Sequence, residues 1–236
     1  MQVVKINKQF WVILSSGMGS NKYVIKSRDL NILIDPGLPS DVSQLCTVLL
    51  KEVQLDPDDI NAILLTHTHP DHSGAVPYFR ERSGAEVLVH HAEVPIFEES
   101  YHQNIQSLFM RDERSYSVKK SLNDGDILLE QDNGRNWRVL HTPGHSKGSI
   151  CLYNEMDGLL ITGDTVFAGG SVGRTDLGDG DSNALLESIA RLCELEIKGF
   201  FPGHMDIVLE NARENIYRSL RTAQWFLDRN SGLGFN

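Results

Sequence analysis

The segment Thr66 to Gly74, THTHPDHSG, places three of the nine histidines of the chain, together with one aspartate, between positions 67 and 72. His67 and His69 are two residues apart, so an extended backbone directs both imidazoles to the same side. Pro70 then turns the chain, and at a turn that enters a helix Asp71 and His72 can face a neighbouring pocket. The spacing therefore predicts two adjacent metal positions within one short segment.

Four side chains are too few for two ions, because protein-bound zinc takes about four ligands. Three further candidates each follow an apolar run and a glycine: His145 in HTPGH, Asp164 in TGDT and His204 in FPGH. Glycine lets the backbone turn sharply or pass close to a metal. Although a single histidine usually binds no metal, this combination predicts a metal site. Nitrogen and oxygen ligands without cysteine indicate zinc first, with iron or manganese as alternatives.

The candidate ligands depend on a series of short strands with helices after them. Apolar runs bounded by polar turns predict ten strands: 10–16, 21–27, 30–37, 60–66, 85–90, 126–130, 137–144, 149–154, 159–164 and 199–204. Helical spacing predicts four helices: 41–53, 75–84 closed by Gly84, 182–195 with Ser182 as N-cap, and 212–230. This order predicts an α/β protein with two sheets packed face to face and helices outside. Each candidate ligand then follows a strand, where a rigid scaffold presents a loop.

Length and composition limit the possible partners. The 236 residues, 40% of them hydrophobic, predict one domain over 1–236. A net charge of −10 and the lack of a basic cluster argue against a nucleic-acid partner. No apolar run approaches the roughly 20 residues of a membrane helix, and the N-terminus does not resemble a signal peptide. Three isolated cysteines suit a reducing cytoplasm, so we expect a cytoplasmic protein that acts on a small molecule.

In order and spacing, the motifs 67–72, 142–145, 163–164 and 203–204 resemble those of the metallo-β-lactamase superfamily, and the likeness runs from about Ile32 to His204. The resemblance implies a four-layer αββα sandwich. It also implies that the first ion is held by His67, His69 and His145, the second by Asp71, His72 and His204, and that Asp164 bridges them. Asp35, in LIDPG, would orient a ligand histidine by a hydrogen bond; otherwise it is an ordinary turn residue.

The same resemblance implies hydrolysis by a metal-bound hydroxide, with two divalent ions as cofactors. Asp71 would be catalytic by accepting a proton from the nucleophile. Gly144-His145-Ser146 is not a serine nucleophile elbow, and no serine or cysteine nucleophile is indicated.

The loop after Asp164, GDTVFAGGSVGRTDLGDGD, resembles that of glyoxalase II-like thioesterases, and its GRTD also resembles persulfide dioxygenases. In those groups the basic residue approaches the substrate, so Arg174 is a candidate substrate contact. It could instead pair with Asp176 or Asp179 on the surface. Two tyrosines typical of glyoxalase II are replaced here by Asp176 and by Met205-Asp206, and too few residues follow His204 for its helical domain. The glutathione carrier is therefore left open.

We expect a glyoxalase II-like hydrolase that cleaves a thioester or ester. The alternatives are a mononuclear iron persulfide dioxygenase on the same fold and a non-enzymatic metal-binding module. A helical insert near 93–120 is expected to pack on the core, or else to form a lid or a homodimer contact, and a C-terminal helix is expected near 212–229. The oligomeric state, including a homodimer, stays open.

Overall fold

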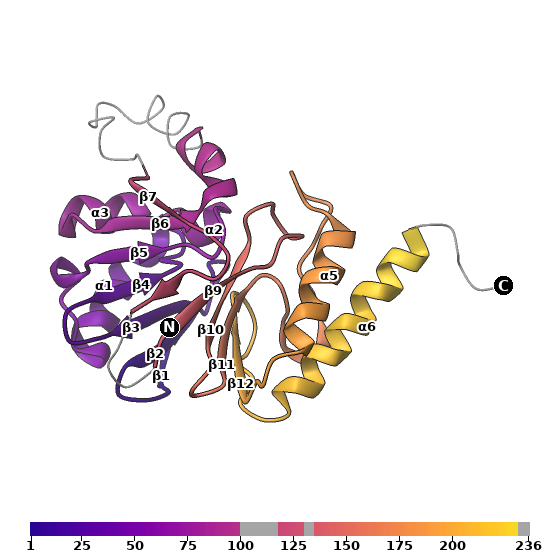
Figure 1. The fold of residues 1–236 in the computed structure, drawn as a ribbon. Helices are drawn as coiled ribbons and strands as arrows, with labels where there is room; N and C mark the ends of the chain where they lie inside the picture. The colour runs from indigo at the N-terminus through magenta and orange to yellow at the C-terminus, as the bar shows by residue number, and fades with distance from the viewer. Residues whose placement is uncertain (100–117, 130–134, 231–236) are drawn as a thin grey trace. The chain divides into compact units, whose positions relative to one another are not determined.

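The computed structural model describes residues 1–99, 118–129 and 135–230, and the chain divides into two compact units, Met1–Leu122 and Asn123–Asn236 (Figure 1). Each unit consists of one sheet with helices against it. The predicted insert lies mostly outside the described residues; of its ends, residues 94–99 are helical and Lys120–Leu122 forms a strand. Within the described part of the chain, no helix has the length and apolar character needed to span a bilayer.

The first unit contains a seven-stranded sheet whose strands follow chain order. They are β1 (Gln2–Lys5), β2 (Phe10–Leu14), β3 (Lys22–Lys26), β4 (Asn31–Ile34), β5 (Ala62–Leu64), β6 (Glu86–His90) and β7 (Lys120–Leu122). The first four pair antiparallel, whereas β4 to β7 run parallel. The carboxyl ends of β4, β5 and β6 therefore meet at one edge of the sheet.

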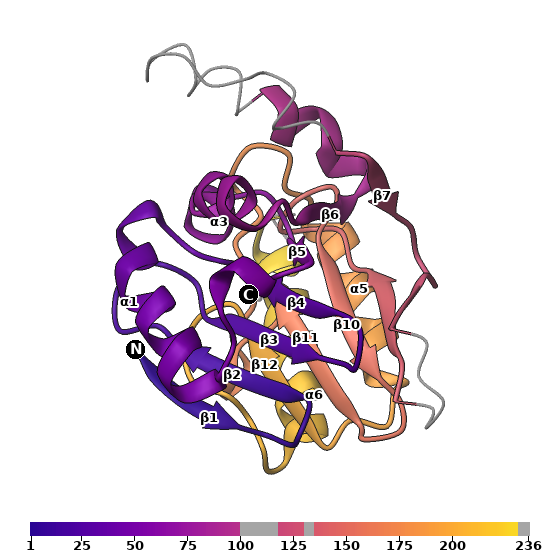
Figure 2. The same cartoon turned by 90° about the vertical axis from the view of Figure 1, so that its left-hand side faces the viewer.

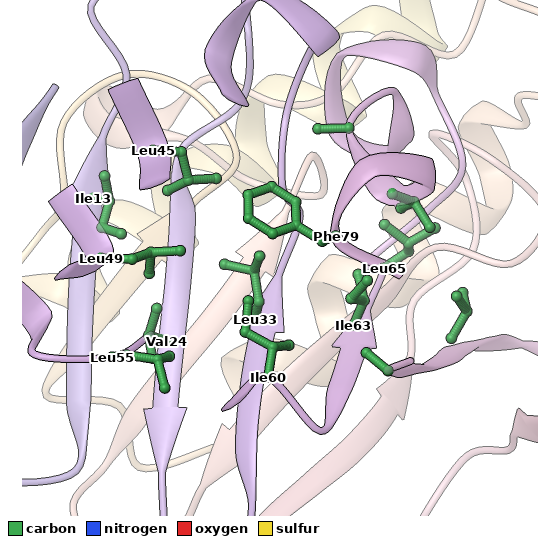
Figure 3. Packing of buried hydrophobic residues seen from close by; sticks show 14 of the residues in the cluster. Ile13, Val24, Leu33, Leu45, Leu49, Leu55, Ile60, Ile63, Leu65 and Phe79 are labelled. Carbon is green, nitrogen blue, oxygen red and sulfur yellow. The ribbon is translucent and has the colours of Figure 1, made fainter. Parts of the chain in front are cut away.

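Two helices, α1 (Val42–Val48) and α3 (Val76–Ser83), cover one face of this sheet (Figure 2). A π-helical turn, Leu49–Val53, extends α1, and α2 (Pro70–Ser73) is a single turn. The described residues of this unit also contain 3₁₀ turns at Pro39–Asp41, Pro57–Asp59 and His91–Glu93. Alternate strand residues Ile13, Val24, Leu33 and Ile63 pack with Leu45, Leu49 and Phe79 in one apolar core (Figure 3). Successive strand residues face opposite sides of the sheet, so every second side chain meets the apolar residues at helical spacing in α1.

The second unit has a five-stranded sheet in the order β12-β11-β10-β9-β8. Its strands are β8 (Ile127–Leu128), β9 (Trp137–His141), β10 (Ile150–Asn154), β11 (Leu159–Gly163) and β12 (Gly199–Pro202). Neighbours pair antiparallel except β11 and β12, so β9, β11 and β12 all point the same way. Helices α5 (Ser182–Cys193) and α6 (Ala212–Asn230) pack on this sheet through Ile189, Leu192 and Ile216, and a 3₁₀ turn spans Ala168–Gly170 (Figure 1).

The sequence located most elements but placed one helix cap incorrectly. Helix α3 ends at Gly84 with φ of +71°, as predicted. The prediction that Ser182 caps α5 is wrong, because the Asp181 carboxylate accepts hydrogen bonds from the amides of Asn183 and Ala184. The Ser182 hydroxyl lies 2.6 Å from the Thr175 hydroxyl instead. A carboxylate beside the first free amides of a helix stabilises it both by hydrogen bonding and through the helix dipole.

Candidate metal centre

In the first unit, candidate metal ligands and the polar residues that contact them lie at the carboxyl ends of three parallel strands. Asp35 follows β4, Thr66 and His67 follow β5, and Glu93 lies in the 3₁₀ turn after β6. His67, His72, Asp35 and Glu93 are all buried at this edge. Buried polar groups need hydrogen-bond partners: His72 pairs with Asp35, while threonines contact His67 and Glu93.

His67 and His69 converge as their spacing predicts. Nε2 of His67 lies 3.0 Å from Nδ1 of His69, and the rings meet edge to face. The hydroxyl of Thr66 donates to Oδ2 of Asp35 at 2.6 Å, so its oxygen is available to accept from Nδ1 of His67 at 3.2 Å. The proton of His67 is then on Nδ1, and the lone pair of Nε2 faces His69. Two imidazole nitrogens directed at one point are the arrangement that a divalent cation requires.

His72 is oriented by Asp35. Its Nδ1 lies 2.8 Å from Oδ2 of Asp35, and both side chains are fully buried. A hydrogen bond at Nδ1 fixes the ring and leaves Nε2 as the ligand atom. That nitrogen is 3.8 Å from Oδ2 of Asp71, so the two adjacent residues do point to one place. Helix α2, which begins at Pro70, provides the turn that makes this possible.

In the second unit, the carboxyl ends of β9, β11 and β12 present His145, Asp164 and His204. Oδ2 of Asp164 lies 3.6 Å from Nε2 of His145 and 3.6 Å from Nε2 of His204. Nδ1 of His145 donates to the backbone carbonyl of Arg174 at 2.7 Å, which makes Nε2 the candidate ligand atom, as in His72. The Asp164 carboxylate oxygen is therefore equally far from the two histidine nitrogens.

Two of the three glycines that precede ligands adopt backbone conformations that favour glycine. Gly144 has φ of +139° and Gly163 has φ of +47°, while Gly203 has no positive φ. A Cβ on Gly144 would lie closer than 3.0 Å to the N, Cα and Cβ atoms of Leu185, so α5 packs directly on the backbone before His145. The amide of Asp181 also donates to the Gly144 carbonyl at 2.8 Å. The start of α5 therefore fixes the His145 loop.

Glu93 is a residue of this region that sequence reasoning did not identify. Its carboxylate accepts hydrogen bonds from both the amide (3.1 Å) and the hydroxyl of Thr68, which stands between the two histidines of the HTH segment. Asp35 does the same for Thr66, through the amide at 2.8 Å and through the hydroxyl. Each of these two histidines is thus preceded by a threonine fixed to a buried carboxylate. The alternating Thr-His pattern was the available signal, because successive side chains of an extended segment face opposite sides.

Arg174 lies on an exposed loop and forms a two-point ion pair with Asp176. Its Nε and Nη2 atoms each lie 2.9 Å from a carboxylate oxygen of Asp176. This is the surface pairing anticipated from the sequence, and Asp179 is not its partner, since Asp179 instead accepts from the Lys147 amide. The loop also borders a pocket of about 430 Å³ with Leu185 and Phe226 in its wall. The structure therefore gives Arg174 an internal partner and an adjacent cavity, and its contact with substrate stays a prediction.

The donor set fits divalent metal binding in both units. Histidine Nε2 or Nδ1 atoms and carboxylate oxygens converge, and buried partners on the far side orient His67, His72 and His145. Borderline cations such as zinc, iron and manganese prefer such mixed nitrogen and oxygen ligands.

Comparison with known proteins found a matching family model and several similar proteins. The family model described as the metallo-beta-lactamase superfamily matches residues 16–204. The probable metallo-hydrolase MJ0888 of Methanocaldococcus jannaschii is 34% identical over 198 residues, covering 81% of this chain and 90% of that protein. Hydroxyacylglutathione hydrolase GloC of Haemophilus influenzae is 29% identical over 66% of this chain and 70% of its own length.

Two solved structures are similar over most of the chain. A metallo-beta-lactamase family protein of Thermus thermophilus, TTHA1429, superposes with a TM-score of 0.74 over 95% of this chain and 82% of that one, at 24% identity. TTHA1623 in a di-iron-bound form gives a TM-score of 0.66 over 89% of this chain and 96% of that one, at 28% identity. The predicted fold class, an α/β protein with two sheets and the fold of this family, is confirmed.

Proposed function

Since the chain belongs to the metallo-beta-lactamase superfamily, we propose that it is a dinuclear metal-dependent hydrolase that cleaves a thioester or a related ester, in the manner of glyoxalase II. The observation that carries the proposal is the orientation of the histidines. His72 and His145 each have Nδ1 occupied by a hydrogen bond from behind, to Asp35 and to the Arg174 carbonyl, which directs Nε2 into the site. Such outer contacts are typical of metal-ligating histidines.

Two ligand groups follow from the family motif. His67, His69 and His145 would hold one ion, whereas Asp71, His72 and His204 would hold the other, with Asp164 shared. The position of Asp164 between two histidines within the second unit supports the shared role. We propose zinc as the metal, with iron or manganese as alternatives, because the ligand atoms suit all three.

When bound, the two ions would lower the pKa of a water molecule and polarise the substrate carbonyl. The residues of the chain account for the remaining requirements. Asp71 is the partly exposed carboxylate of the cluster, so it can accept a proton from the attacking water. Asp35 and Glu93 hold the HTH segment through Thr66 and Thr68, which keeps the ligand geometry fixed during the reaction.

The substrate class is inferred from the relatives and from the loop that carries Arg174. GloC is named as a hydrolase of hydroxyacylglutathione, a thioester. In our proposal, the Arg174 guanidinium binds a carboxylate of a small-molecule substrate and leaves Asp176 to do so, with the neighbouring pocket receiving the rest of the molecule. We also propose a cytoplasmic enzyme without a nucleic-acid or membrane partner. The role of a homodimer is left to measurement of the molecular mass in solution.

The deciding experiment combines elemental analysis of the purified protein with a panel of thioesters and esters that includes lactoylglutathione. We expect two divalent ions per chain and hydrolysis of at least one thioester. A single iron per chain together with sulfite formation from glutathione persulfide would refute hydrolysis in favour of the dioxygenase. A metal-replete protein inert toward every ester would favour a binding module.

Asp164→Ala tests the shared ligand. This variant should lose activity and bound metal, whereas Asp157→Ala should retain both, since Asp157 precedes β11 at its opposite end and its carboxylate pairs with the exposed Arg135. Full activity with two ions in Asp164→Ala would refute the assignment.

A further inference from the structure

Lys22 is a lysine with no exposed surface, located on β3 of the first unit. Its Nζ donates to Oδ2 of Asp41 at 2.7 Å and to the carbonyl of Ser20 at 2.6 Å. Lysine is almost never fully buried unless it is paired, because removal of its charge from water is costly. A surface lysine keeps a protein soluble, so a fully buried ammonium at this position must have a different role.

Two loops close over this ion pair. A Cβ on Gly37, which has φ of +86°, would lie 2.6 Å from Cε of Lys22 and 2.5 Å from Oδ2 of Asp41. A Cβ on Gly19 would likewise overlap the Asp41 carboxylate. The carboxylate also accepts from the amide of Leu38 at 3.1 Å. The ion pair thus joins the loop before β3 to the loop after β4, with glycines where the backbone must approach it.

The same two loops form hydrogen bonds with the backbone of the turn that carries Asp71 and His72, which we call the ligand turn. The amide of Ser20 donates to the carbonyl of Asp71 at 3.0 Å, and the amide of Gly37 donates to the carbonyl of His72 at 3.0 Å. The Gly37 carbonyl in turn accepts from the amide of Ala75 at 2.8 Å. These contacts set the direction of two adjacent residues whose side chains must reach one place.

We propose that Lys22 is a positioning residue for the Asp71–His72 half of the metal site: its ion pair with Asp41 locks the two loops whose amides orient the backbone of both ligands. This inference rests on the proposed function. It explains how the side chains of the consecutive residues Asp71 and His72 converge. It also places a buried positive charge where it acts on the carboxylate of the ligand Asp71. Asp35 and Asp71 act electrostatically on this ammonium.

Burial lowers the pKa of the Lys22 ammonium below its ordinary value, and the carboxylates of Asp41, Asp35 and Asp71 oppose that shift. Its partners are therefore what keep a buried ammonium charged. Removing the ammonium would leave the Asp41 carboxylate, which is largely buried, without its cation.

The test is Lys22→Met, with Lys26→Met as the matched control. Lys26 ends the same strand, but its Nζ binds the carbonyl of Gln54, far along the chain from the ligand turn. Equilibrium titration of the metal-free protein with Co²⁺, followed by absorbance, should show one of the two ions bound roughly 10- to 100-fold more weakly in Lys22→Met, the usual effect of losing an outer contact. Lys26→Met should titrate like the wild type.

Amide hydrogen exchange of the metal-free proteins gives a second readout, independent of activity. The amides of Ser20 and Gly37 should exchange roughly tenfold faster in Lys22→Met, while those of the strand Ile150–Asn154 keep their wild-type rates. If Lys22→Met does not fold, Asp41→Asn, which keeps the size and one acceptor oxygen, should shift both readouts in the same direction.

Unchanged Co²⁺ affinities and unchanged exchange at Ser20 and Gly37 in a folded Lys22→Met or Asp41→Asn protein would overturn the proposal. Neither readout involves a substrate. A wild-type protein that binds two ions but cleaves no thioester or ester would therefore refute the proposed function, and the comparison of variants would still decide the role of Lys22.

Discussion

Gly144→Ala should damage both the stability of the protein and the position of His145. The added methyl group would lie closer than 3.0 Å to three atoms of Leu185, where ordinary contact begins at 3.4 Å. The residue also has φ of +139°, a conformation that side chains with a Cβ rarely adopt. Either α5 or the loop before His145 must move.

The expected magnitude follows from these two effects. The disfavoured backbone conformation costs about 1–3 kcal/mol. Overlap with a packed helix costs a further 1–3 kcal/mol or so. At roughly 2–4 °C per kcal/mol for a chain of this size, the melting temperature should fall by about 4–24 °C. A displacement of about 1 Å at His145 should also lower kcat/KM by roughly 100-fold.

Thermal unfolding and kcat/KM should be measured beside Gly84→Ala. Gly84 also has a positive φ, of +71°, but no atom lies within 4 Å of the position of its Cβ. That variant should lose only the cost of the backbone conformation, about 1–2 kcal/mol, and should keep its activity. The contrast isolates the contact with Leu185.

A Gly144→Ala protein that has the same melting temperature as Gly84→Ala and retains wild-type kcat/KM would refute the reasoning. It would mean that α5 does not determine where His145 lies.

Three other outcomes are expected. Glu93→Ala should lower the free energy of unfolding by about 1–3 kcal/mol, because it leaves the amide of Thr68 buried without its acceptor; urea denaturation measures this. Partial burial raises the pKa of Asp124, but hydrogen bonds from Arg191 and from the backbone outweigh it, so the net pKa is lowered. The stability that Asp124 provides is therefore present above its ordinary value of 3.8 and lost at lower pH, and the difference in melting temperature between wild type and Asp124→Asn should shrink as the pH falls through that region. Burial raises the pKa of the Cys151 thiol to about 11, so iodoacetamide should label Cys46 in the native protein and Cys151 only after unfolding.

Arg174→Ala examines the substrate class. KM should rise only for substrates that carry a carboxylate, with kcat little changed, because an anion-binding contact acts on the bound state. Asp176→Asn removes the internal partner of Arg174 and should lower KM for the same substrates. Wild-type KM values for carboxylate-bearing substrates in both variants would exclude Arg174 as the anion contact.

Local sequence patterns were sufficient to predict most elements of the fold. Apolar runs bounded by polar turns predicted β2 to β6 and β8 to β12, and helical spacing predicted α1, α3, α5 and α6. Strands β1 and β7 were not recognised as separate elements. β1 has only two apolar residues between polar ends, and β7 is three residues at the end of the predicted helical insert. Short edge strands are specified mainly by the partner they pair with, which a local pattern does not contain.

The sequence by itself determined the chemistry of the site: which side chains offer nitrogen and oxygen donors, and that one short segment could not complete two ions. Tertiary structure decided what holds those donors in place. The acceptor for His145 is a backbone carbonyl, at Arg174, and residue types do not reveal which carbonyl will be close. Glu93 and Lys22 lie far along the chain from the atoms they orient, and only the parallel pairing of β4, β5 and β6 and the loops over β3 bring them there. The identity of the ligands depends on side-chain chemistry, which can be read from the local sequence. Their orientation depends on contacts between distant segments, and these contacts form only when the chain folds.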